Sequence, residues 1–316
     1  MADYRLNERA GILAQFLLPD ADRLRIAVTS VAESRIIDAG IQAEGGLEAG
    51  IALARLCSGD LLHVQLVPGQ LAGRGWTLVS VNSDHPLAAC LFSQYAGWQL
   101  AVGKYFAMGS GPMRAAAARE ELFQQFNYRE SSASLVGVLE GRKLPTPEVI
   151  AEIAGKTGVE PSQITLAIAP TASAAGNLQV VARVVETALH KLHEVGFDVT
   201  RIRSASGFAP LSPVAKDDLT AIGRTNDAIL YGGRVTLWVR GDDESIAEIG
   251  PKVPANGSAA YGQPFIKIFE AAGRDFYKID PHLFSPAEIT FQNLDTGRVQ
   301  TFGRIDEGVL QDSFGL

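Results

Sequence analysis

Arg183 and Glu186 are the two residues of this 316-residue chain whose types and spacing most directly permit acid–base chemistry. They stand three residues apart in NLQVVARVVETALHKLHE (177–194), where apolar residues recur at helical spacing. On one helix such residues lie side by side. The carboxylate can then take a proton from water, while the arginine favours its charged form and burial opposes it. A solvated surface ion pair, worth only about 0.3–0.5 kcal/mol, fits the same pattern.

Other kinds of catalytic site find little support in the sequence. His190 and His193 lack a carboxylate at metal-ligand spacing, and we interpret them as surface residues. The glycines at 45–50 and 109–112 do not complete the G-x-G-x-x-G pattern of a dinucleotide site, and no G-x-S-x-G nucleophile motif occurs. We therefore expect neither a metal nor a nicotinamide cofactor.

Three short stretches, at 108–112, 170–173 and 223–227, concentrate glycine and small polar residues. Loops of this composition let the backbone approach a planar or phosphorylated ligand closely, although plain turns have the same composition. Residues 261–265 and 284–286 share this ambiguity.

The composition is that of a folded soluble protein, with 47% hydrophobic and 20% charged residues. A net charge of −7 without a Lys/Arg cluster argues against a nucleic-acid partner. No apolar run is long enough for a membrane span, and the N-terminal segment reads as an amphipathic helix rather than a signal peptide. Cys57 and Cys90 are expected to be buried free thiols in the reducing cytoplasm.

Helical and strand-like segments alternate along the chain, which predicts a mixed α/β (α+β) fold in two lobes. The lobes are expected at 1–145 and 146–316, linked through 141–148, although a discontinuous domain is an open alternative. Expected helices lie near 7–18, 45–57, 85–103, 147–157, 177–194 and 217–231. Expected strands lie within 23–31, 34–40, 75–83, 132–140, 163–169 and 234–240, with a hairpin formed by 287–293 and 297–305.

Six segments, taken in order and spacing, resemble the methenyltetrahydromethanopterin cyclohydrolase family over nearly the whole chain. They are IIDAGIQAEGGLEAG, LFSQYAGWQLAV, YFAMGSGPMRA, APTASAAGNLQVVARVVETALHKL, GRTNDAILYGG and YGQPFIKIFEAAGRDFYKIDPHLFSPAEI. No single segment is diagnostic, but their arrangement is specific.

The resemblance implies a cytoplasmic hydrolase of one-carbon metabolism, acting in formaldehyde oxidation and methylotrophy. Water opens the 5,10-methenyl bridge of tetrahydromethanopterin, or of its dephospho form, to give the N5-formyl compound. The family implies a homotrimer of two-lobed subunits with the pterin in a cleft between the lobes, and neither a redox cofactor nor a metal. Its catalytic arginine and glutamate match Arg183 and Glu186. The sequence leaves open the carrier's phosphorylation and the physiological direction.

Nine further residues are expected to line the pterin site. A pterin's donor and acceptor edge needs amide or carboxylate partners, which Gln94, Asn226 and Asp227 can supply. The expected binding residues are Ser93, Gln94, Tyr95, Ser110, Gly111, Thr171, Ser173, Asn226 and Asp227.

Two other functions compete with the cyclohydrolase hypothesis. A non-catalytic tetrahydropterin-binding or assembly protein of the same fold would have no need of Glu186, which this sequence retains. A dehydrogenase acting on the same carrier would need the nicotinamide fingerprint that the sequence lacks.

Overall fold

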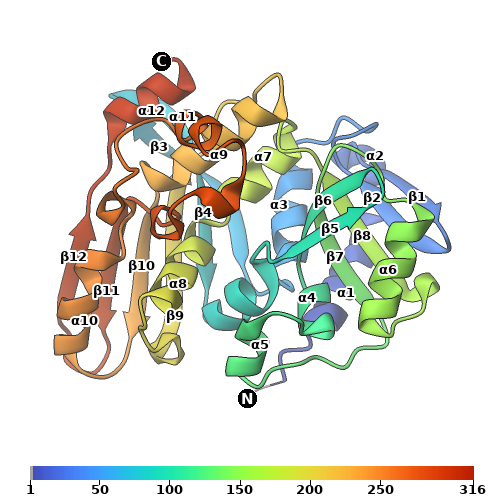
Figure 1. Cartoon of the computed structure of the whole chain (residues 1–316), viewed down its shortest axis with the longest axis horizontal. Coiled ribbons are helices and arrows are strands. Elements are labelled where there is room, and N and C mark those ends of the chain that lie inside the picture. Colours follow the sequence, from blue (N-terminus) through green and yellow to red (C-terminus); the bar gives the residue numbers. More distant parts are fainter. Residues whose placement is uncertain (1–2) are drawn as a thin grey trace. The chain divides into compact units, whose positions relative to one another are not determined.

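The computed structural model describes residues 3–316, which form two compact units of mixed helix and strand (Figure 1). Unit 1 contains the chain up to Leu62 together with Ala88–Gln179, and unit 2 contains His63–Leu87 together with Val180–Leu316. The mixed α/β class is confirmed, and both units are discontinuous in sequence. This division differs from one boundary after residue 145, because residues 141–148 lie within unit 1 and residues 63–87 belong to unit 2.

Unit 1 is built on a six-stranded mixed sheet in the order β1-β2-β8-β7-β6-β5. Its strands are β1 (Ala27–Val31), β2 (Ser34–Asp38), β5 (Trp98–Val102), β6 (Tyr105–Ser110), β7 (Leu135–Glu140) and β8 (Ile164–Ala169). The neighbours β2, β8 and β7 are parallel, and the outer pairs are antiparallel. Every residue of β8 is buried, as the continuous apolar run ITLAIA predicts for a central parallel strand.

Helices cover both faces of the unit 1 sheet. One apolar cluster joins the sheet to α4 (Met113–Ala117) and α6 (Pro147–Thr157), and another joins the opposite face to α1 (Leu6–Leu17) and α3 (Leu47–Cys57). Two shorter helices are α2 (Ala21–Leu24) and α5 (Glu121–Gln125). Helix α6 has the limits predicted from the sequence, with proline at its first position and left-handed Gly158 directly after its end.

Unit 2 has its own six-stranded sheet, in the order β12-β11-β10-β9-β4-β3. Its strands are β3 (His63–Leu71), β4 (Arg74–Ser83), β9 (Ile202–Pro210), β10 (Arg234–Val239), β11 (Glu288–Asn293) and β12 (Val299–Gly303). Only β10 and β11 are parallel neighbours. The expected hairpin at the C-terminal end is confirmed by the antiparallel pairing of β11 with β12.

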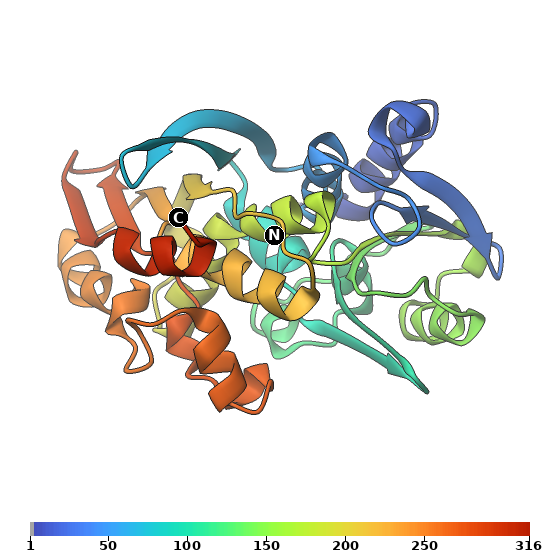
Figure 2. The same cartoon turned by 90° about the horizontal axis from the view of Figure 1, so that it is seen from above.

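The helices of unit 2 are visible as separate coils in Figure 2. They are α8 (Val184–Glu194), α9 (Asp218–Leu230), α10 (Asp243–Ile249), α11 (Phe265–Ala271) and α12 (Glu307–Phe314). Helix α8 packs on β9 and β10. This packing requires glycine at 207, because a Cβ there would lie 2.7 Å from Val185 Cγ2 and 2.9 Å from Val184 Cγ1.

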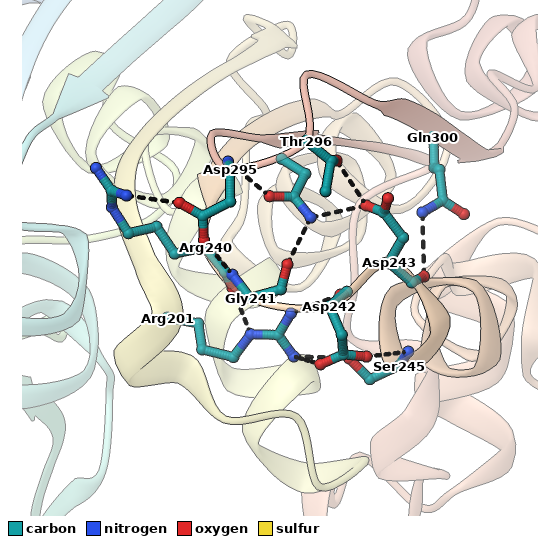
Figure 3. Close-up of polar contacts among 10 residues, drawn as sticks. Arg201, Arg240, Gly241, Asp242, Asp243, Ser245, Asp295, Thr296 and Gln300 are labelled. Atoms are coloured by element: carbon teal, nitrogen blue, oxygen red, sulfur yellow. Dashed lines mark hydrogen bonds and ion pairs between the residues drawn. The ribbon is translucent and has the colours of Figure 1, made fainter.

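A polar network ties the start of α10 to neighbouring strand ends of unit 2 (Figure 3). Asp295 accepts hydrogen bonds from Arg240 Nη1 at 2.6 Å and from the Gly241 backbone N–H at 2.8 Å. Asp242 caps α10 by accepting from the Ser245 backbone N–H at 2.7 Å. The network therefore fixes the β10–α10 connection against the turn between β11 and β12.

Two expected helices differ from the structure, and two observed strands were not expected. The segment 85–103 is not one helix: it forms a π-helix, η1 (Leu87–Gln94), followed by strand β5. Strands β3 and β6 were not predicted. The expected helix at 177–194 is two helices, since α7 (Ala174–Val181) ends before α8 begins. Within residues 3–316, no helix combines the length and apolar character that crossing a bilayer requires.

Candidate active site

Arg183 and Glu186 lie at the junction between α7 and α8. Arg183 is the N-cap residue of α8, with φ −83° and ψ 5°, and Glu186 is in the first turn. The two residues therefore do not lie within one continuous helix, because the helical path breaks at Ala182 and Arg183. The valines on both sides of the break have low helix propensity, since their β-branched side chains are restricted in a helix.

Both side chains are buried, which overturns the interpretation as a solvated surface pair. The exposed fraction is 6% for Arg183 and 4% for Glu186. Burying an ionised group costs several kcal/mol unless its surroundings compensate, so such groups concentrate at functional sites. The amide groups at the start of α8 provide part of this compensation for Glu186, because a helix N-terminus favours negative charge.

Gln179, on α7, is another buried polar residue of the same segment, with an exposed fraction of 1%. Its Nε2 donates to Glu140 Oε1 at 3.1 Å, and Glu140 is the last residue of β7. The carboxyl ends of parallel strands are where open α/β sheets commonly bind ligands. Glu140 is not among the site residues predicted from the sequence, although its position at the end of an apolar strand was a usable signal.

The expected binding residues 93–95 and 110–111 come together in unit 1. Ser93 and Gln94 end the π-helix, where the Tyr95 N–H donates to the Cys90 carbonyl, and π-helical turns are frequent at functional sites. The Gly111 N–H donates to the Ser93 carbonyl at 2.8 Å, which joins the two stretches.

The hydroxyls of Ser93 and Ser110 are completely buried and engaged within unit 1. Ser93 Oγ donates to the Cys57 carbonyl at 2.7 Å, and Ser110 Oγ donates to the Val138 carbonyl at 3.2 Å. Ser110 Oγ also lies 3.1 Å from Cys57 Sγ. In this structure these hydroxyls hold the two segments in position.

Arg114 organises the same region and was not identified from the sequence. Its side chain has no exposed surface and forms a two-pronged ion pair with Glu120. Its Nη1 also donates to the carbonyls of Leu91 and Ser93, each at 3.1 Å, and the guanidinium lies over the ring of Tyr95. A planar fork of five donors makes arginine suited to holding several acceptors at once. Its place within the resembling segment YFAMGSGPMRA was the only available signal.

Thr171 and Ser173 follow the carboxyl end of β8 and lead into α7. Ser173 Oγ accepts from the Gly176 N–H at 3.0 Å and donates to the Pro170 carbonyl at 2.8 Å, so Ser173 acts as the N-cap of α7. Position 176 must be glycine, because a Cβ there would lie 2.1 Å from the Pro170 carbonyl oxygen.

Asn226 and Asp227 lie inside α9, which confirms the helix expected near 217–231, so the stretch 223–227 is not a loop. Asp227 is fully buried and accepts from the Phe265 N–H at 2.8 Å and from Ser313 Oγ at 2.6 Å, which ties α9 to α11 and α12. Burial raises the pKa of Asp227 to about 7, against the lowering effect of these two hydrogen bonds. Asn226 Nδ2 donates to the Ile222 carbonyl of its own helix. The ligand role of both residues stays a prediction.

Within the described part of the chain, no group of three or more His, Cys, Asp or Glu side chains is arranged to hold a metal ion. Cys57 and Cys90 are buried thiols that form no disulfide among residues 3–316, as predicted.

Comparison with known proteins gives one consistent family. The family model described as "Cyclohydrolase (MCH)" matches residues 5–314. A protein of Rhodopirellula baltica named methenyltetrahydromethanopterin cyclohydrolase is 48% identical, over 98% of this chain and 95% of its own length. Proteins with the same name from Methylobacillus flagellatus and Methanosarcina barkeri are 45% and 39% identical, over 98% of this chain and 95% and 98% of their own lengths. The chain therefore belongs to the methenyltetrahydromethanopterin cyclohydrolase family.

Proposed function

We propose that this protein hydrolyses the 5,10-methenyl bridge of tetrahydromethanopterin, or of its dephospho form, to the N5-formyl compound. The relatives that share its full length carry the name of this activity. The structural observation that best supports the proposal is the burial of Arg183 and Glu186 at the α7–α8 junction.

In the proposed reaction Glu186 activates the attacking water. The methenyl group is an amidinium-like cation and is already electrophilic. As the water oxygen bonds to the bridge carbon, Glu186 accepts one proton and returns it to the bridge nitrogen when that carbon–nitrogen bond breaks. The second proton of the water leaves to solvent as the formyl carbonyl forms, because a cation becomes a neutral amide. The reaction involves no net oxidation or reduction, so it consumes no redox cofactor.

Arg183 is proposed to keep Glu186 in its reactive, charged form. A guanidinium near a buried carboxylate opposes the desolvation that would otherwise favour the neutral acid. The N-terminus of α8 also favours the charged form of Glu186. The carboxylate in turn stabilises the positive charge of the bound substrate.

The decisive experiment compares Glu186→Gln and Arg183→Ala with the unaltered protein. Each variant should lower turnover by about 10²–10⁴-fold, the usual contribution of a positioned general base. The measurement follows the loss of methenyl absorbance with purified protein and no nucleotide.

The matched control is Glu194→Gln, since Glu194 ends the same helix and its side chain is 47% exposed. This variant should turn over normally, and all variants should show unchanged circular dichroism. Near-normal turnover in both active-site variants would contradict the assignment. Tight pterin binding without turnover in the unaltered protein would instead favour a non-catalytic binding protein.

The proposal also covers the binding residues, the assembly and the cellular location of the protein. The nine expected binding residues would contribute contacts to the pterin or hold the segments that do so. The protein would assemble as a homotrimer and act in the cytoplasm, in the formaldehyde oxidation of methylotrophic metabolism.

A further inference from the structure

Unit 2 contains a pocket of about 320 Å³ where α9, α11 and α12 meet. Helix α9 lines it with Thr220, Gly223 and Arg224, which share one helical face at spacings of three and four residues. Lys267 of α11, together with Asp312 and Ser313 of α12, completes the polar part of the wall. None of the residues proposed to be catalytic lines this pocket.

Close packing of the helices shapes the pocket. A Cβ at Gly223 would lie 3.0 Å from Ile266 Cβ, so glycine permits α11 to approach α9 at this point. Asp227 holds the same three helices together from within, through the Phe265 N–H and Ser313 Oγ. The pocket therefore has walls that are fixed by hydrogen bonds and by backbone proximity.

Two cations on these walls have no carboxylate partner within the described part of the chain. Arg224 Nε donates to the Ser313 carbonyl at 3.2 Å, and Nη1 lies 3.5 Å from the Pro213 carbonyl. Neither Arg224 nor Lys267 forms an ion pair among residues 3–316, whereas Arg240, also in unit 2, pairs with Asp295. Asp312 is the one acidic side chain in the wall, so the lining carries a net positive charge.

The donors of Arg224 are only partly used by this structure. A guanidinium has five N–H groups, and the two carbonyl contacts leave its Nη2 group for another acceptor. Half-burial of Arg224 between helices reduces the competition from water, which strengthens a charge-assisted hydrogen bond to an anion.

We propose that this pocket is an oxyanion site, which binds the phosphate or carboxylate group of a small molecule through Arg224 and Lys267. Arginine matches the geometry of two oxygens on one phosphorus or carbon atom, and lysine adds a mobile point charge at the rim. The group is carried either by a free metabolite or by the carrier on which the enzyme acts.

The first test is calorimetric titration of inorganic phosphate into the full-length protein, with chloride at matched ionic strength as the reference. The unaltered protein should bind phosphate saturably, and Arg224→Gln should weaken binding by about 10-fold or more. Lys267→Gln should weaken it less, because this exposed side chain is screened by solvent.

The matched control is Lys104→Gln, which removes an exposed lysine from a different pocket in unit 1 and should leave phosphate binding unchanged. Because Arg224 also contacts α12, thermal melting must show that Arg224→Gln folds, and the exposed Lys267 provides an independent variant. Absence of saturable binding in the unaltered protein, or unchanged binding in both pocket variants, would overturn the site.

The second test identifies the source of the anion. If both variants raise the KM of the methenyl substrate and phosphate competes with it, the bound group belongs to the carrier. An unchanged KM assigns the site to a free anion, and either result is compatible with the site. The KM measurement rests on the proposed function, whereas the phosphate titration does not. Failure of the proposed function can therefore be distinguished from failure of the anion site.

Discussion

At the scale of single residues, the buried charged groups of this protein have two roles: one group is structural, and the others are proposed to be catalytic. Arg114 is buried, and its guanidinium contacts a carboxylate, two carbonyls and aromatic rings. These contacts explain its burial by a structural role. Arg183 and Glu186 were recognisable in the sequence through their family resemblance alone. Periodicity cannot distinguish a buried polar face from a solvated one, because both have the same spacing.

Loss of the Arg114 guanidinium should destabilise the fold strongly. Arg114→Met leaves Glu120 and two carbonyls without their donor, and removing one partner of a buried pair costs about 3 kcal/mol or more. Urea unfolding measures the change in free energy. Arg23→Met, which removes the exposed ion pairs with Asp20 and Glu48, should have a much smaller effect on the free energy of unfolding. Equal effects of the two substitutions would contradict the structural role of Arg114.

At the scale of secondary-structure elements, local sequence signals predict where a helix begins and ends better than they predict whether a short apolar segment is a helix or a strand. Helix α6 begins at a proline and is followed directly by left-handed Gly158, and in the structure Asp217 caps α9. Segment 85–103 was misassigned because its apolar residues suit both helix and strand, and only pairing with β6 decides for β5. The break between α7 and α8 could not be predicted, because the sequence has no glycine or proline at this point.

The junction of α9, α11 and α12 should be sensitive to pH through Asp227. Its pKa is raised by burial from 3.8 to about 7, so folding favours the protonated acid. This contribution to stability is complete below pH 3.8 and is lost as the pH rises through about 7. The limiting slope for one such group is about 1.4 kcal/mol per pH unit.

Asp227→Asn should therefore remove part of the stability loss between pH 4 and pH 8, because the amide does not ionise. Its oxygen can still accept from the Phe265 N–H, and its NH₂ group can donate to Ser313 Oγ. Urea unfolding across this pH range, for both proteins, gives the comparison. Parallel pH profiles would show that Asp227 does not titrate in this interval.

For the whole molecule, the fold class follows from the alternation of elements, but the division into units does not. Strand β4 pairs with β9, as in Ser83 with Ala205, and this long-range pairing assigns residues 63–87 to unit 2. No turn composition or linker marks such an exchange, because it depends on which distant strand provides the partner.

The proposed homotrimer is testable by its mass. The chain has a mass of 33.7 kDa, so light scattering of the purified protein should give about 101 kDa, independent of shape. The measurement should be repeated over a hundredfold dilution. A mass near that of a single chain at every concentration would contradict the assembly.

The early position of the β3–β4 hairpin has a consequence for synthesis on the ribosome. Ser83 is translated long before Ala205, its partner on β9, and at 5–20 residues per second the interval is roughly 6–25 s. During this time β4 presents an edge with unpaired N–H and C=O groups, the kind of edge that joins the nascent chains of neighbouring ribosomes. The hairpin is thus exposed to pairing with other chains until β9 has been synthesised.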